Sequence, residues 1–81
     1  MEEVGRVTHY YPKISVAVVE LKNSLKVGDK ILIRGATTNF EQIVESMQIE
    51  HKDVQVAEPG QSVGIKVKGK VRENDKVYRL E

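Results

Sequence analysis

A row of alternating cations near the carboxyl end is the part of this sequence whose spacing most suggests binding chemistry. The row consists of Lys66, Lys68, Lys70 and Arg72. On a β-strand, side chains two residues apart project from the same face at a spacing of about 6.6–6.8 Å. That spacing is near the one between phosphates along an extended single strand, so the row predicts contact with a nucleic-acid backbone. The alternative is that these cations only keep a strand soluble and prevent edge-to-edge aggregation.

Two further residues extend this candidate RNA-binding set. Arg79 lies in the last apolar run of the chain and adds a cation there. Tyr10 and Tyr11 are adjacent, and neighbouring strand residues face opposite sides, so we expect only one of them in the core. We assign Tyr10 to stacking on a base, with a tyrosine that merely covers the end of the core as the alternative.

The sequence contains few residues in arrangements typical of a catalytic site or a metal site. The phosphate-binding motifs G-x-x-x-x-G-K-[ST] and G-x-G-x-x-G are absent, and no serine has a G-x-S-x-G setting. His9 and His51 lie far apart and form no H-x-x-x-H pair, while the chain has no cysteine. We therefore predict a domain that is not an enzyme and that needs no metal, no nucleotide and no other cofactor.

Length and composition set the scale of the fold. The 81 residues suffice for one domain spanning 1–81, and 40% of them are hydrophobic. The net charge is only +1, so attraction for nucleic acid must come from a local patch such as the basic carboxyl end. The chain shows no signal-peptide pattern and no apolar run near the roughly 20 residues of a membrane span. These features predict a soluble cytoplasmic protein without a membrane partner.

Closely spaced turn signals divide the chain into short β-branched runs. The strands that we predict are Glu3–Thr8, Ile14–Leu21, Lys30–Arg34, part of Phe40–Ile49, Val63–Val67 and Lys76–Leu80. The clearest turn is Pro59-Gly60, because proline presets φ at the second turn position and glycine accepts the positive φ at the third. Short strands between frequent turns indicate an all-β barrel or sandwich.

Strand 14–21 is apolar on both faces. One face carries Ile14, Val16 and Val18, and the other carries Ala17, Val19 and Leu21. A strand of a small antiparallel barrel usually has one wet face. Either a loop covers the outer face of strand 14–21, or that face contacts a protein partner or a second domain.

The segment 40–49 fits two secondary structures. Phe40, Ile43, Val44 and Met47 have the i, i+3, i+4, i+7 spacing of a helix face. Ile43, Met47 and Ile49 also fit one face of a strand, with Glu45 as the exception. The residues alone leave this choice open, although the periodicity narrowly favours the helix.

The stretch "SMQIEHKDVQVAEPGQSVGIKVKG" (46–69) resembles the second domain of the translational GTPases, such as elongation factor Tu. The family pattern A-x-P-G-x-x-V-G-hydrophobic-x-hydrophobic is supplied here by Ala57, Pro59, Gly60, Val63, Gly64, Ile65 and Val67. The segments "GRVTHYY" and "SLKVGDKILIRG" are similar to the opening strands of the same domain. The whole chain is also similar to small translation elongation factor-like proteins and, more weakly, to the C-terminal barrel of collagenase-like peptidases.

This resemblance implies a six-stranded antiparallel Greek-key β-barrel of the translation-protein type, with strand rather than helix over residues 43–49. A five-stranded OB-like barrel with a short helix in 40–49 is the alternative fold. The resemblance also implies a non-catalytic, translation-factor-like module that binds RNA or a ribonucleoprotein such as the ribosome. The alternative function is a protein–protein interaction module, which docks through strand 14–21 on a separately encoded enzyme such as a collagenase-like peptidase.

Overall fold

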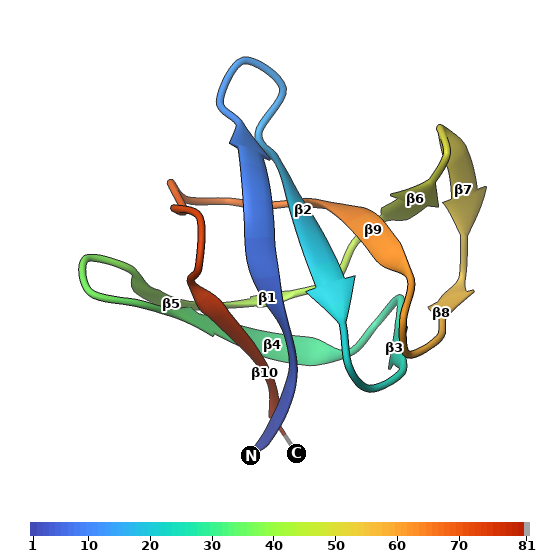
Figure 1. The fold of residues 1–81 in the computed structure, drawn as a ribbon, viewed down its shortest axis with the longest axis horizontal. Coiled ribbons are helices and arrows are strands. Elements are labelled where there is room, and N and C mark those ends of the chain that lie inside the picture. The colour runs from blue at the N-terminus through green and yellow to red at the C-terminus, as the bar shows by residue number, and fades with distance from the viewer. Residues whose placement is uncertain (81) are drawn as a thin grey trace.

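The short β-branched runs form strands, and no helix occurs in the computed structural model, which describes residues 1–80 (Figure 1). The strands are β1 (Glu2–Tyr11), β2 (Val16–Leu21), β3 (Leu25–Lys26), β4 (Lys30–Arg34), β5 (Asn39–Ile43), β6 (Met47–Ile49), β7 (Lys52–Val54), β8 (Val56–Ala57), β9 (Ser62–Lys66) and β10 (Lys76–Leu80). The predicted all-β class is therefore confirmed. Over this described range, the chain has no helix long and apolar enough to cross a bilayer.

Eight strands form one antiparallel sheet in the order β5-β4-β10-β1-β2-β9-β6-β7, and β3 pairs with β8 separately. The long strand β1 lies at the centre, and its pairing register shifts once against β10 and once against β2. Such bulges increase the local twist and bend a strand. Gly5 lies at the first of these shifts, where a Cβ atom would come within 2.4 Å of the Glu20 carbonyl oxygen. The bend in β1 therefore depends on a glycine at position 5.

The core lies inside the curled sheet and consists of aliphatic side chains from nearly every strand. Alternation along the strands selects them: β2 buries Ala17, Val19 and Leu21, and β9 buries Val63 and Ile65. The predicted turn at Pro59-Gly60 is confirmed, with φ of 90° at Gly60 and a hydrogen bond from the Gln61 amide to the Glu58 carbonyl. The same turn places β9 against β2 in the register that the hydrophobic pattern requires.

The alternative helix in residues 40–49 is wrong, because β5 and β6 lie there instead. The strand expected over residues 43–49 is present at both ends, and residues 44–46 between β5 and β6 belong to no strand. A helix would have gathered Phe40, Ile43, Val44 and Met47 on one face. In the structure Ile43 is 44% exposed, while Gln42 is buried in its place. The local periodicity misleads here because pairing of β5 with β4 decides the conformation.

The strand ladder is not closed into a barrel within residues 1–80, since it ends at β5 on one side and at β7 on the other. Across the opening, the Gln42 side chain makes one hydrogen bond to the last residue of β9 and one to the chain just after it. Its Nε2 donates to the Lys66 carbonyl at 2.8 Å, and its Oε1 accepts from the Lys68 amide at 2.8 Å. One side-chain amide thus joins β5 to the end of β9 where backbone pairing is missing.

Candidate functional site

An apolar hollow of about 410 Å³ lies on the outer face of β2 and β9. We call it the docking groove. It is bordered by the β1–β2 hairpin on one side and by the β6–β7 hairpin on the other, and Figure 1 shows these two turns projecting on either side of β9. Its apolar lining comes from Tyr11, Ile14, Val16, Val18 and Gly64, and its polar lining from Gln48, Glu50, His51 and Ser62.

The sequence creates this groove by placing large residues beside a glycine. Val18 pairs with Gly64 across the β2–β9 ladder, and Gly64 pairs with Gln48 across the β9–β6 ladder. Because position 64 has no side chain, the surface is hollow between its neighbours. A Cβ at Gly64 would lie 3.2 Å from Cγ1 of Val16 and would begin to fill the space.

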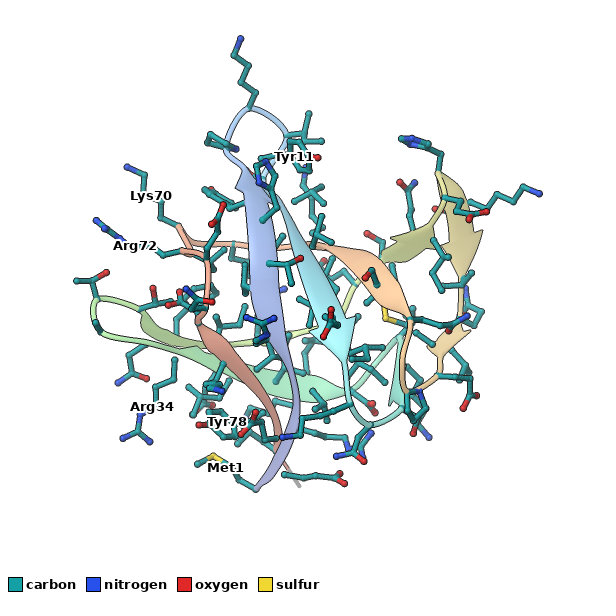
Figure 2. The ribbon with its side chains drawn as sticks, viewed as in Figure 1. Met1, Tyr11, Arg34, Lys70, Arg72 and Tyr78 are labelled. Carbon is teal, nitrogen blue, oxygen red and sulfur yellow. The ribbon has the colours of Figure 1, made fainter. Side chains whose placement is uncertain are left out.

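The outer face of strand 14–21 is therefore left partly uncovered. Val16 and Val18 are half-buried, whereas Ile14 is 57% exposed and Tyr11 is 48% exposed. Figure 2 shows Tyr11 at the hairpin end of β1, beside the groove. Clustered exposed apolar residues of this kind mark interaction surfaces more often than single exposed residues do.

Strained backbone borders the groove on both sides. Ser15, Glu50 and His51 have φ of 55°, 52° and 66°, although none of them is a glycine. Glu50 and His51 are the two central residues of the β6–β7 turn, where a tight hairpin requires positive φ at both positions. Each such residue costs about 1–2 kcal/mol. A fourth such residue, Asn74 with φ of 76°, does not line the groove, so a positive φ alone does not mark this surface.

The basic row does not continue along a strand as predicted, because β9 ends at Lys66. After that residue, the Val67 amide bonds the Ser15 carbonyl and the Lys68 amide bonds the Gln42 side chain. These contacts replace a regular ladder, so the even strand spacing that suggested phosphate contact is lost. Lys66 itself donates from Nζ to the Ile14 carbonyl at 3.0 Å. Lys68, Lys70 and Arg72 are exposed, and Figure 2 shows Lys70 and Arg72 projecting outward.

Arg79 forms part of the internal structure. Its guanidinium donates to the Ser24 carbonyl at 2.6 Å, lies 3.6 Å from Asp29 and pairs with Glu2. The hydrogen bond to Glu2 is the main cause that raises the pKa of Arg79. Tyr10, assigned to base stacking, packs against the core, and the neighbouring Tyr11 is the exposed tyrosine. Because Tyr10 and Tyr11 are adjacent on a strand, one of them was expected to be buried, but the sequence did not indicate which one.

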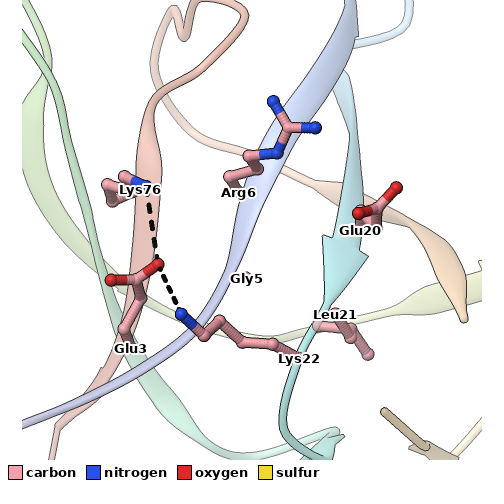
Figure 3. Close-up of a pocket in the computed structure, with 7 residues that line it drawn as sticks. All are labelled: Glu3, Gly5, Arg6, Glu20, Leu21, Lys22 and Lys76. Carbon is pink, nitrogen blue, oxygen red and sulfur yellow. Dashed lines mark hydrogen bonds and ion pairs between the residues drawn. The ribbon is translucent and has the colours of Figure 1, made fainter. Parts of the chain in front are cut away.

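A second hollow, of about 230 Å³, contains a cluster of ionic side chains (Figure 3). The Glu3 carboxylate lies 3.3 Å from Nζ of Lys22 and 3.6 Å from Nζ of Lys76. The hydrogen bond from Lys22 is the main cause that lowers the pKa of Glu3. These charges join β1 to β10 and to the end of β2, so we interpret the cluster as structural. Among residues 1–80, no three His, Asp or Glu side chains are grouped as a metal site would require.

The chain is similar to one domain of much longer proteins. Residues 2–77 match the peptidase family U32 C-terminal domain. The chain is 54% identical over 80 residues to an uncharacterized protease of Methanocaldococcus jannaschii, and 40% identical over 80 residues to a collagenase of Porphyromonas gingivalis. These matches cover 98% and 96% of this chain but 20% and 22% of the relatives. The chain therefore spans about a fifth of the length of these curated relatives.

A solved structure agrees with the sequence matches. It is the C-terminal domain of a Geobacillus thermoleovorans protein assigned to the U32 peptidases. The two chains superpose with a TM-score of 0.92 at 28% identity, covering 99% of this chain and 93% of the other.

These comparisons correct the predicted translation-factor and RNA-binding role, since the family match points to U32 peptidases. The weaker resemblance to collagenase-like peptidases is the one that is confirmed. Apart from Gly64, which lines the groove, the misleading motif consists of structural residues. Gly60 forms a turn, and Val63, Ile65 and Val67 fill the core. Residues with such roles specify a fold and carry no information about a partner.

Proposed function

Because this chain belongs to the family of peptidase U32 C-terminal domains, we propose that it is a non-catalytic docking domain of U32 peptidases. In this proposal, the domain packs through the docking groove on the peptidase portion of a U32-family protein. The observation that carries the proposal is the uncovered apolar face of β2 and of the turn before it, where Ile14 is more than half exposed. Burying apolar surface contributes about 25 cal/mol per Å², so such a face stabilises a complex.

The position of the chain ends supports this arrangement. Figure 1 shows the start of β1 and the end of β10 together at one end of the molecule, away from the two hairpin turns. Chain connected to the domain at these ends leaves the groove accessible. The length of the relatives supports the proposal as well, because about four fifths of each lies outside the matched segment and offers a surface on which the domain can dock.

We also propose that the fold acts as a six-stranded Greek-key barrel formed by β1, β2, β4, β5, β9 and β10. The paired order of these strands supports it, since β5-β4-β10-β1-β2-β9 is continuous. The opening between β5 and β9 is bridged by the two Gln42 hydrogen bonds. A closed wall would hold the outer face of β2 and β9 rigid and keep the groove preformed.

The docking proposal is tested by binding between the purified domain and the part of the M. jannaschii protease that lies outside the matched segment. The variant Ile14→Asp places a charge on the groove, and Val56→Asp is the matched control. Ile14 is 57% exposed and Val56 is 51% exposed, but Val56 lies on β8 outside the groove. Both variants keep the core intact, so their free energies of unfolding should remain within about 0.5 kcal/mol of the wild-type value.

We expect Ile14→Asp to weaken binding at least about tenfold. Loss of one buried aliphatic contact costs about 1.4 kcal/mol, which corresponds to a tenfold change in the dissociation constant. Val56→Asp should change the dissociation constant by less than about twofold. If the two variants changed the dissociation constant equally, the interface would not lie at the docking groove. An absence of any binding by the wild-type domain would refute docking on this portion of the protein.

A further inference from the structure

We propose that the docking groove recognises an extended partner segment in which an apolar side chain and a basic side chain occupy positions i and i+2, with one residue between them. The apolar side chain enters the hollow over Gly64, and the basic side chain pairs with Glu50. This inference rests on the proposed docking function and adds the chemistry of the segment that is bound. It follows from the shape of the groove floor and from the charge on its rim.

The part of the floor over Gly64 has room for an aliphatic side chain. Val18 and Gln48 lie on either side of Gly64 in the paired strands, so the hollow has walls on two sides and backbone below. Val16 limits the hollow along β2, since its Cγ1 lies 3.2 Å from the Cβ position of residue 64. A branched or linear aliphatic group would fill this space and exclude water from it. A polar group would lose its hydrogen bonds to water on entering it.

The rim supplies a carboxylate that other side chains leave available. Glu50 lines the groove, and it forms no ion pair with any residue in the described range 1–80. The other acid of this hairpin, Asp53, accepts a hydrogen bond from the Gln48 side chain at 3.0 Å. At the opposite border, Lys66 bonds the Ile14 carbonyl, which places a positive charge there. His51 lines the groove beside Glu50, and Glu50 is the acidic residue of the lining, so a partner cation is favoured at the Glu50 end.

The order of the two contacts along β6 and its turn suits an extended chain. Gln48 faces Gly64 across the β6–β9 pair, and Glu50 follows two residues later at the hairpin turn. Side chains two residues apart on an extended segment lie on one face, about 6.8 Å from each other. A segment placed along β6 thus presents its apolar residue to the hollow and its basic residue to Glu50. The left-handed backbone of Glu50 and His51 sets the direction in which the Glu50 side chain leaves the chain.

The experiment uses three synthetic peptides and the isotope-labelled wild-type domain. The probes are acetyl-Thr-Leu-Thr-Arg-Thr-amide, the same peptide with Glu in place of Arg, and the same peptide with Ser in place of Leu. Binding is followed by the amide chemical shifts of the groove residues at low ionic strength. The domain variant Glu50→Gln is compared with Glu45→Gln, an exposed acid outside the groove.

We expect the Leu–Arg peptide to shift Gly64 and Ser62 and to bind at least about threefold more tightly than the Leu–Glu peptide, a preference that salt reduces. The preference should disappear in Glu50→Gln and persist in Glu45→Gln. The Ser–Arg peptide should bind least. Equal binding of the Arg and Glu peptides, or shifts away from the groove, would overturn the inference. So would concentration-dependent shifts of the same residues without peptide, because a second copy of the chain would then occupy the groove.

The two proposals fail in different ways. If Ile14→Asp abolishes docking on the peptidase portion while the peptides show no preference, the groove is an interface and the proposed segment chemistry is wrong. If the peptides bind as expected while the peptidase portion does not, the recognition chemistry stands and the partner is a different protein.

Discussion

The Gln42 side chain is predicted to hold the fold together at the opening between β5 and β9. It is only 4% exposed, and its amide makes two hydrogen bonds of 2.8 Å to the backbone of Lys66 and Lys68. Each bond contributes about 1 kcal/mol net, and each backbone group left without a partner costs about 1–3 kcal/mol. Leucine has a similar volume and leaves no large cavity, so Gln42→Leu isolates the loss of these bonds. We expect a cost of about 2–4 kcal/mol.

This loss is large against the total stability of so small a domain, which at about 0.05–0.15 kcal/mol per residue is about 4–12 kcal/mol. Urea unfolding monitored by circular dichroism measures the difference directly. The matched control is Gln48→Leu, since the Gln48 amide donates one exposed hydrogen bond, to Asp53. Its removal should cost about 0.5 kcal/mol or less. Both variants should keep the denaturant slope of the wild-type protein.

Two outcomes would refute this reasoning. If Gln42→Leu and Gln48→Leu differed by less than about 0.5 kcal/mol, the Gln42 amide would have no special role in joining the strands. If Gln42→Leu were more stable than the wild-type protein, apolar packing at this position would outweigh the two hydrogen bonds. In either case the support for a barrel closed by a side chain would be lost.

Two further predictions concern the ends of the paired strands. The pKa of Glu3 is lowered in the folded state, chiefly by Lys22, so its ion pair stabilises the fold above the unfolded-state pKa and is lost as the pH falls through the folded-state pKa. We expect Glu3→Gln to lower Tm at pH 7, with the difference from wild type closing under acidic conditions; a gap that persists in acid would contradict this assignment. Gly5→Ala places a Cβ 2.4 Å from the Glu20 carbonyl oxygen, so it should cost about 2 kcal/mol or more in urea unfolding, whereas an unchanged midpoint would show that the bulge can relax.

The strands could be predicted where hydrophobic alternation and turn residues agree. Lys30–Arg34 and Lys76–Leu80 were predicted with the bounds that β4 and β10 have in the structure. Strand 14–21 was predicted two residues too long, because Ser15 adopts left-handed backbone in the hairpin and β2 begins at Val16. That backbone conformation is set by the turn as a whole, and a serine gives no signal for it.

The structural features that the sequence did not reveal depend on contacts between residues far apart in the chain. The basic row keeps its alternating burial beyond Lys66, but its hydrogen bonds go to Ser15 and to the side chain of Gln42. Arg79 was a candidate for binding RNA, whereas it bonds the Ser24 carbonyl, which lies 55 residues away in the chain. Neither the contacts of the basic row nor that of Arg79 produces a recognisable pattern in the local sequence. The unusual feature that the sequence did show was the doubly apolar strand, and its outer face became the floor of the groove.

Two features beside the groove have a local cost in stability. Glu50 and His51 take left-handed backbone at a cost of about 1–2 kcal/mol each, and neither belongs to the aliphatic core. Ile14 stays more than half exposed at a position where a polar side chain would be more soluble. A small domain can tolerate these costs only when the rest of the fold compensates for them, and here the core packing does so. Two of the exposed large apolar side chains, Tyr11 and Ile14, lie together at the groove, whereas Ile43 and Val56 are exposed outside it. Under the docking proposal, a partner would bury the aliphatic floor and contact the β6–β7 turn beside it.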